Sequence, residues 1–429
     1  MSVIEVAIAR GPTGYRVEVV RCPAGEASAD IALDVDALSA QRKAVEEAVL
    51  LSLVQSRKVF PEEQRVRGIG QALFGPLFGT GAVAGRYRAA ERDEDLRIVL
   101  RINDPALAGL PWEAMYDEES GGYVCRRHQL VRHVDVPAAA APLTVTPPLR
   151  ILGIVSSPRG LPQLDVDKEK EQLGRALSRL TADGLVELAW APSATWADLH
   201  DTLLGGTWHA LHFIGHGDFD PSHNEGILAL TSEDGRMHLV DGSRFVDMLR
   251  QARPVPRLVV LNSCSGAASG VTDLFSGTAA ALVRGGVTAV DAMQYEITDA
   301  AAIAFARGFY SAIARGRGVD EAVSSTRVAI LGLSGRTLEW VTPVLYLRGE
   351  ETRLFTIPAA SAEMAARPRS PVPASRRPRT PTPDHIVKML TGHTRAVYSV
   401  AFSRVAFSPD GTLLATASDD KTVRLWGAG

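Results

Sequence analysis

Residues 146–356 are predicted to form an α/β domain in which a mainly parallel sheet lies between helices. Three observations predict this class. Apolar segments of strand length alternate with helical segments along the chain, which is typical of a parallel sheet covered on both faces. The strand segments are apolar at nearly every position, as expected of buried strands. A length of about 200 residues is also enough for one such domain.

The elements of this domain follow from the same pattern. The expected strands lie at 150–156, 185–191, 208–215, 257–263, 287–293 and 343–348. The expected helices lie between most of them, at 166–180, 194–204, 243–252, 276–286, 299–316 and 319–331.

Residues 1–145 are predicted to form a separate α+β domain. Strand-like segments lie at 3–9, 15–21, 31–36, 97–102 and 129–136. A helical segment spans 36–54, with Asp36 as a plausible cap. After the second domain, residues 357–384 are rich in proline and arginine, which predicts an extended linker rather than a packed core.

The composition is that of an ordinary globular protein, with 46% hydrophobic and 22% charged residues among 429. The net charge of −3 gives no electrostatic case for binding nucleic acid or a membrane surface. No apolar run approaches the roughly 20 residues of a membrane span, and the first residues lack a signal-peptide pattern. The three scattered cysteines, Cys22, Cys125 and Cys264, argue against a disulfide framework and for a reducing cytoplasm.

Cofactor and metal motifs are weak in this sequence. The segment GTGAVAG at 79–85 lacks the spacing of a dinucleotide fingerprint, and neither GxxxxGK[ST] nor GxSxG occurs. His209, His212 and His216 follow the pattern HxxHxxxH. However, a strand directs residues 209 and 212 to opposite faces, so we expect core or sheet-face histidines and no metal site. No cofactor is expected.

Two strand ends carry reactive side chains. The segment TWHALHFIGHGDFD places His216 between two glycines, and RLVVLNSCSG places Cys264 at the end of an apolar run 48 residues later. Catalytic groups gather at the carboxyl ends of parallel strands. A nearby imidazole can take the proton of a thiol and make it nucleophilic. The alternative is that Cys264 is a buried thiol, since cysteine is among the most buried residue types.

Residues 150–348 resemble the CHAT family of caspase-like cysteine peptidases. The resemblance rests on HFIGHG at 212–217, VVLNSC at 259–264, SGTAAALVRGG at 276–286 and the following stretch to residue 316. LRINDPALAGLPWEAMYD at 100–117 resembles the segment that often precedes this domain. One departure is that Cys264-Ser265-Gly266 has one residue before the glycine, where the family often has two.

This resemblance implies a caspase-like fold and a metal-independent peptidase. Cys264 would attack the peptide carbonyl, and His216 would activate the thiol and protonate the leaving amine. The oxyanion hole would consist of the backbone N–H groups of Gly217 and Cys264.

Acidic residues near the expected site could bind a basic side chain of the substrate. Asp218 and Asp220 follow His216, and Asp291 and Asp299 flank the next strand end. Asp299 has a second interpretation as a helix cap, because a helical segment follows it directly.

Residues 385–429 resemble one WD-repeat unit, predicted to form a single β blade. The matching pieces are GH at 392–393, SPDG at 408–411 and ATASDDKTVRLW, although the unit ends in Trp-Gly instead of Trp-Asp. One unit is about one blade, whereas a propeller needs roughly four to eight.

The sequence therefore predicts a cytoplasmic cysteine endopeptidase, an effector module in bacterial signalling or conflict. Its partners would be a protein or peptide substrate and a regulatory protein bound through residues 1–145 or the WD-repeat unit. The alternative is an inactive caspase-like scaffold for protein binding, which would not need to retain His216 and Cys264. A nucleotide-binding regulator has no phosphate loop to support it.

Overall fold

The structure is a computed structural model. It describes residues 2–12, 14–52, 61–92, 95–134, 141–220, 223, 225–262, 276–333, 337–358, 413–417 and 423–427. The chain divides into two compact units, Met1–Arg367 and Pro368–Gly429.

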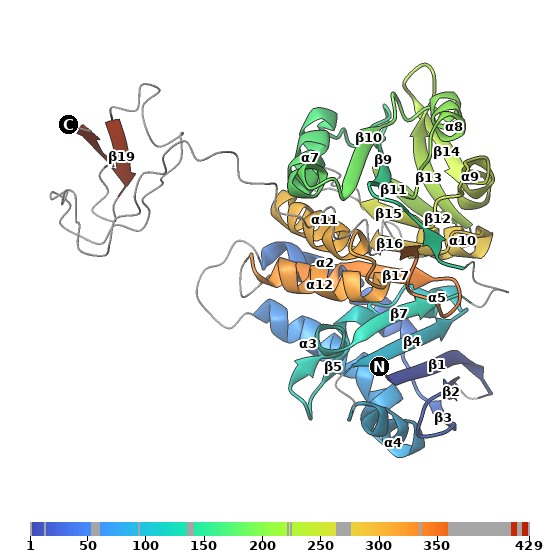
Figure 1. The fold of residues 1–429 in the computed structure, drawn as a ribbon. Coiled ribbons are helices and arrows are strands. Elements are labelled where there is room, and N and C mark those ends of the chain that lie inside the picture. The colour runs from blue at the N-terminus through green and yellow to red at the C-terminus, as the bar shows by residue number, and fades with distance from the viewer. Residues whose placement is uncertain are drawn as a thin grey trace. The chain divides into compact units, whose positions relative to one another are not determined.

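Among the described residues of the first unit, eleven strands form one sheet (Figure 1). From one edge to the other they are β10 (Val186–Trp190), β9 (Leu149–Val155), β11 (Ala210–Ile214), β15 (Leu258–Asn262), β16 (Ala289–Met293), β17 (Pro343–Leu347), β7 (Gln129–His133), β4 (Leu96–Ile102), β1 (Ser2–Gly11), β2 (Gly14–Arg21) and β3 (Ala27–Ile31). Smaller sheets consist of β12 (Gly217–Asp220) with β13 (Glu225–Thr231) and β14 (Met237–Asp241), of β5 (Tyr116–Asp117) with β6 (Gly122–Tyr123), and of β8 (Leu143–Thr144) with β18 (Phe355–Thr356).

Helices connect and cover these strands. They are α1 (Val35–Ala40), α2 (Arg42–Leu51), α3 (Pro61–Phe74), α4 (Gly81–Ala90), α5 (Pro105–Ala108), α6 (Val124–Arg127), α7 (Val166–Ala182), α8 (Trp196–Gly205), α9 (Gly242–Leu249), α10 (Ser276–Gly285), α11 (Asp299–Ile313) and α12 (Val319–Leu331). Short helical turns are the π-helix η1 (Gly75–Gly79) and the 3-10 helices η2 (Trp112–Ala114) and η3 (Glu339–Val341).

Every strand and helix expected between residues 150 and 348 is present, and most of the sheet is parallel. The α/β class with a mainly parallel sheet between helices is therefore confirmed. The central strands β11, β15 and β16 are buried at every position, because helices cover both faces of the sheet. Side chains at alternate positions enter two apolar cores. Leu258 and Val260 belong to the core beneath α7, α11 and α12, and Val259 and Leu261 to the core beneath α8, α9 and α10.

One strand reversal fixes which strand ends meet. β11, β15 and β16 are parallel, β16 and β17 are antiparallel, and β17, β7 and β4 are again parallel. The carboxyl ends of β11 and β15 and the amino ends of β7 and β4 therefore lie at the same edge of the sheet. We call this the reactive edge.

The boundary expected near residue 145 does not separate two compact units. β17 pairs with β7, so the sheet continues into the first 145 residues. A buried ion pair and a buried hydrogen bond also connect the two segments: Arg97 Nε donates to Asp320 Oδ2 at 2.6 Å, and Arg97 Nη2 donates to Thr352 Oγ1 at 3.0 Å. Residues 1–145 and 146–356 therefore form one body with a shared sheet.

Two helix starts differ from the sequence-based expectation. Asp34, not Asp36, caps α1, and its carboxylate accepts a hydrogen bond from Ala37 N. Thr298, not Asp299, caps α11 through Ala301 N. In both helices the expected residue lies in the first turn, where its negative charge is favourable near the helix N-terminus.

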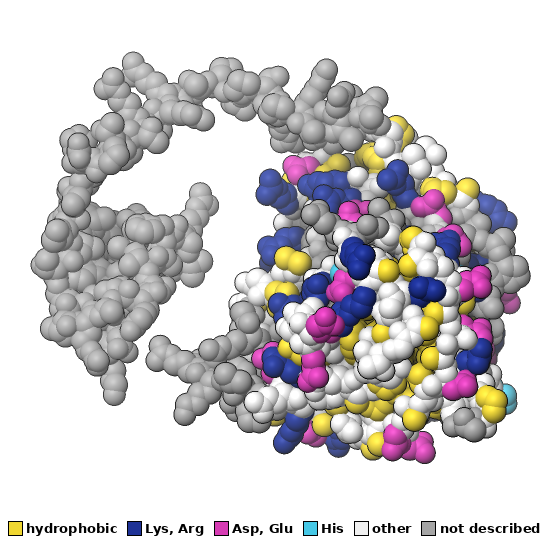
Figure 2. All heavy atoms as spheres, turned by 90° about the horizontal axis from the view of Figure 1, so that it is seen from below, with side chains coloured by type: hydrophobic (Ala, Val, Ile, Leu, Met, Phe, Trp, Pro, Cys, Tyr) yellow, Lys and Arg dark blue, Asp and Glu magenta, His cyan; other side chains and the backbone are white. Residues whose placement is uncertain are grey.

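Basic and acidic side chains are interspersed on the described surface seen from below (Figure 2). Among the described helices, none is long and apolar enough to cross a membrane.

The second unit is described only by two strands. β19 (Leu413–Ala417) and β20 (Val423–Gly427) pair antiparallel, as two neighbouring strands of a blade would. The linker expected at 357–384 lies almost wholly outside the described residues.

Candidate functional site

The two strands that lead to His216 and Cys264 are neighbours. β11 and β15 pair in parallel with Ile214 opposite Asn262, and Gly215 N donates to Asn262 O at 3.2 Å. His216 lies two residues beyond Ile214, and Cys264 lies two residues beyond Asn262. Cys264 is outside the described residues, so the distance between the imidazole and the thiol stays a prediction.

Gly215 sets the path of the chain between β11 and His216. A Cβ at this position would lie 2.8 Å from the Phe213 ring and 3.1 Å from Ser156 O. Both distances are shorter than normal contacts, and both neighbours are buried. Only glycine therefore lets the chain turn past Phe213 and present His216 at the reactive edge.

A backbone carbonyl orients His216. The side chain is 7% exposed, and its Nε2 lies 2.8 Å from Pro162 O. A carbonyl only accepts hydrogen bonds, so Nε2 carries the hydrogen, and in the neutral imidazole Nδ1 keeps a lone pair. The loop that supplies this carbonyl is held by Gln163, whose Nε2 donates to Pro158 O at 2.8 Å and to Leu161 O at 2.9 Å.

The N–H of Gly217 points away from the neighbouring strand. Ala229 N donates to His216 O at 3.0 Å, and Gly217 lies opposite Leu228 in the antiparallel pair of β12 and β13. Hydrogen-bonded and non-hydrogen-bonded pairs alternate in such a ladder. Gly217 therefore occupies a non-hydrogen-bonded pair, and its N–H is not used by β13.

The two other histidines have local partners. His209 Nδ1 accepts a hydrogen bond from Arg150 N at 2.9 Å. His212 is fully buried, its Nδ1 lies 2.9 Å from the Tyr310 hydroxyl, and burial lowers its pKa to about 3. Among the described side chains, no group of three or more His, Cys, Asp or Glu residues could hold a metal ion.

The structure does not bring the four candidate acidic residues together. Asp218 and Asp220 lie on β12, directly after His216. Thr278 of α10 donates to the backbone carbonyl of Asp218 at 3.0 Å. Asp299 begins α11, where its carboxylate binds Lys168 Nζ of α7 at 2.6 Å.

Asp291 lies inside the sheet instead of flanking its edge. It is the middle residue of β16, its side chain is 0% exposed, and burial raises the pKa of its carboxyl well above the usual value. Its side chain therefore does not reach the surface at which a substrate would bind.

A small cavity lies just beneath the ends of β11 and β15. Its lining includes Glu169 and Gln172 of α7, His212, Ile214 and Asn262. Its volume of about 10 Å³ is room for no more than one water molecule, so it holds no substrate side chain in this conformation.

Sequence reasoning missed two features of the site. The first is the Pro162 carbonyl, since a backbone acceptor leaves no side-chain signal. The second is the antiparallel sheet of β12, β13 and β14, which extends the chain directly after His216. The short apolar run at 227–230 was the available signal for this sheet.

Comparisons with known proteins agree with the sequence. The family model described as CHAT domain matches residues 64–370. The model described as WD domain, G-beta repeat, matches residues 385–427. The first match spans more than half of the chain, so the chain belongs to the CHAT domain family. Both resemblances expected from the sequence are confirmed.

Solved structures resemble the chain more distantly. Two crystal structures of the Saccharomyces cerevisiae separase-securin complex, at 3.0 and 2.6 Å resolution, match with TM-scores of 0.45 and 0.46, each at 12% identity. They cover 81% and 82% of this chain, which itself spans 30% of the matched chains. The Drosophila initiator caspase Dronc matches with a TM-score of 0.30 at 10% identity, over 49% of this chain and 92% of its own.

Proposed function

We propose that this chain is a caspase-like cysteine endopeptidase in which His216 and Cys264 form the catalytic dyad. One observation carries the proposal: β11 and β15 are adjacent parallel strands with Ile214 opposite Asn262, and each reactive residue follows its strand end by two positions. Membership in the CHAT domain family supports the same assignment.

The proposed reaction uses the lone pair of His216. With Nε2–H donated to Pro162 O, Nδ1 takes the thiol proton of Cys264, and the thiolate attacks the peptide carbonyl. The carbonyl oxygen becomes an oxyanion that accepts hydrogen bonds from Gly217 N–H and Cys264 N–H. The imidazolium then gives its proton to the leaving amine. A water molecule, deprotonated by His216, hydrolyses the thioester and restores the thiol.

The Pro162 carbonyl has a defined part in this scheme. A nucleophile–base pair works best when a third group orients the base, and here a backbone oxygen does so. It also accepts the Nε2 hydrogen of the imidazolium, whose positive charge this carbonyl dipole stabilises.

Asp218 and Asp220 stay the candidate binders of a basic substrate side chain, because they follow His216 on β12. Asp220 and Asp299 are the weaker candidates, since the Asp220 carboxylate lies 2.6 Å from His223 Nδ1 and that of Asp299 already binds Lys168. We further propose that the chain acts in the cytoplasm as an effector in bacterial signalling or conflict. A regulatory protein would bind its WD repeat or the part of the sheet formed by residues 1–145.

The alternative function is an inactive scaffold that uses the same fold for protein binding. A scaffold does not need a histidine whose imidazole is oriented at the strand end by a backbone carbonyl. This orientation of His216 therefore favours the peptidase.

The decisive experiment compares the wild-type chain with Cys264→Ala and Cys22→Ala. We expect a thiol-directed activity probe to label wild type and Cys22→Ala at residue 264, and not Cys264→Ala. Peptide-library hydrolysis should fall at least a thousandfold in Cys264→Ala alone. Equal hydrolysis by wild type and Cys264→Ala would overturn the dyad, and absence of labelling at residue 264 would favour the scaffold.

A further inference from the structure

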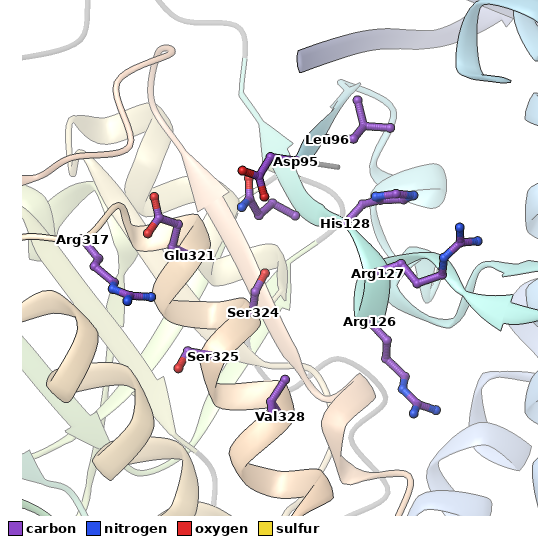
Figure 3. A pocket seen from close by; sticks show the side chains of 11 residues that line it. Asp95, Leu96, Arg126, Arg127, His128, Arg317, Glu321, Ser324, Ser325 and Val328 are labelled. Carbon is purple, nitrogen blue, oxygen red and sulfur yellow. The ribbon is translucent and has the colours of Figure 1, made fainter. Parts of the chain in front are cut away.

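A second cavity, of about 520 Å³, lies at the start of β4 and β7. One wall is α12, which contributes Arg317 from its preceding turn, Glu321, Ser324, Ser325 and Val328. The opposite wall is Asp95 and Leu96 at the start of β4, followed by residues 126–129 of α6 and β7. Figure 3 shows the α12 side chains facing Asp95, Leu96 and His128 across the cavity. The volume is within the range of small-molecule and peptide sites.

The charges of this cavity are balanced and separated. Arg127 is held by Glu91 at 3.2 Å, and the guanidinium of Arg126 lies over the Trp340 ring at 5.3 Å. Among the described residues, the side chains of Asp95, Arg317 and Glu321 form no hydrogen bond or ion pair. The cavity therefore offers the two carboxylates of Asp95 and Glu321 and the two accessible guanidinium groups of Arg126 and Arg317. Among the described side chains, these groups do not neutralise one another.

Such a lining fits a ligand that carries both signs of charge. A carboxylate of the ligand can bind Arg317 through two hydrogen bonds, and a basic group can bind Asp95 or Glu321. The hydroxyls of Ser324 and Ser325 can bind backbone amides. A phosphorylated small molecule fits less well, because its negative charges would face Asp95 and Glu321 without an excess of basic groups.

The β4 and β7 wall of the cavity lies on the reactive edge, whereas Arg317 lies toward the opposite edge. α11 begins at the reactive edge and runs 15 residues away from it before Arg317, and Val319 N donates to Thr352 O beyond the carboxyl end of β17. The strand pairs place Val259, Val290, Tyr346 and Arg132 in one row across β15, β16, β17 and β7. Asn262 of β15 and Gln129 of β7 each lie three residues from this row, and the opposite directions of the two strands put both at the same edge. Three strand spacings separate them, about 14 Å at about 4.8 Å each.

We propose that this cavity is an exosite that binds a segment of the protein substrate with one acidic and one basic side chain. The inference rests on the proposed peptidase function. An extended chain covers about 3.3 Å per residue, so a segment about four to six residues from the cut bond reaches the β7 wall of the cavity, and one about seven or eight residues from it reaches Arg317. α7, α11 and α12 form one helical layer (Figure 1), so such a segment follows a single face of the molecule.

The test measures binding apart from chemistry. Full-length Cys264→Ala protein is titrated with fluorescent peptides Ala-Glu-(Ala)n-Arg-Ala, with n from zero to three, and with the same peptides carrying Gln for both charges. We expect the charged peptides to bind, and Arg317→Glu to weaken binding by about tenfold to a hundredfold. Arg317 is exposed, and among the described residues its side chain has no ion pair to lose, so the variant should fold. Arg179→Glu, at an exposed arginine of α7, is the matched control and should bind as the parent does.

Several results would overturn the exosite. They are equal binding of the Glu/Arg and Gln peptides, equal binding by Arg317→Glu and its control, or tighter binding of adenosine monophosphate than of every peptide. In the otherwise wild-type chain, Arg317→Glu should leave labelling by the small thiol probe unchanged. Peptide binding that depends on Arg317, without any hydrolysis by wild type, would remove the proposed function and leave the cavity as a peptide site. Hydrolysis without such binding would remove the exosite alone.

Discussion

The two parts of the sheet that meet at the pair β16–β17 are stabilised in different ways. In β11, β15 and β16 the strands are buried at every position and almost wholly apolar. In β7 and β4, charged side chains are buried and paired: Arg132 Nε donates to Glu113 Oε1 at 3.0 Å, and Arg97 binds Asp320. These two buried ion pairs thus lie on other strands than those of the candidate dyad. In this fold a buried ion pair connects distant segments of the chain, whereas the candidate reactive groups follow apolar strands.

The largest expected effect comes from a substitution at the end of the apolar strand β11. We expect His216→Ala to lower peptide hydrolysis by about a hundredfold to ten-thousandfold, because the proposed dyad then loses the base that takes the thiol proton. His209→Asn, at the opposite end of the same strand, should leave kcat/KM within about threefold. Both are measured with the peptide library and with thermal unfolding. If His216→Ala is as active as wild type, a histidine at the end of β11 has no catalytic role.

The second test is on the charged part. Glu113→Ala leaves Arg132 buried without its carboxylate, so we expect the free energy of unfolding to fall by about 3–5 kcal/mol. Glu119→Ala removes a carboxylate that is 78% exposed and pairs with Arg88 at 2.9 Å. Its expected cost is at most about 1 kcal/mol. Urea unfolding measures both, and equal losses would contradict the distinction between buried and exposed pairs.

The smallest expected effect is a pH dependence of the folding stability, which comes from His212 in the apolar strand β11. The folded-state pKa of His212 is about 3, below its usual value of 6.5. Below pH 6.5 the unfolded state therefore binds the proton more readily, and stability falls by about 1.4 kcal/mol per pH unit as the pH decreases toward 3.

The buried carboxyl of Asp291 acts with the opposite sign, because its pKa is raised and its contribution falls as pH rises above the unfolded value. The measurement is therefore the difference in urea unfolding free energy between wild type and His212→Gln, at pH 7 and pH 5. Wild type should lose more stability than the variant on acidification. Parallel losses would show that His212 is not buried as a neutral group.

Local patterns predicted the elements better than their connections. The apolar segments from 150 to 348 indicated each strand and helix of the central sheet because burial on both faces leaves a continuous apolar run. The pairing of β17 with β7 left no such trace, since it joins residues more than 200 positions apart. The boundary expected at residue 145 was wrong for this reason.

In the candidate site, too, the local elements were predictable from the sequence and the contacts between distant segments were not. Both strand ends followed from the runs before His216 and Cys264, and their adjacency agrees with the expected parallel neighbours. Asp291 was misplaced because a single carboxyl within a short apolar strand resembles a strand-end residue in sequence. The Gly217 N–H direction depends on the pairing of β12 with β13, which is a tertiary property.

The carbonyl of Pro162 has a consequence for any mutational survey of this protein. Every side chain at position 162 leaves a carbonyl in the backbone, so a scan by substitution would score the position as indifferent even if the oxygen matters. Its influence would surface instead at Gln163, whose amide holds the loop through Pro158 O and Leu161 O. The importance of this atom would thus be recorded one residue away from where it is exerted, and only a change of the backbone itself, such as an ester in place of the amide, would address it directly.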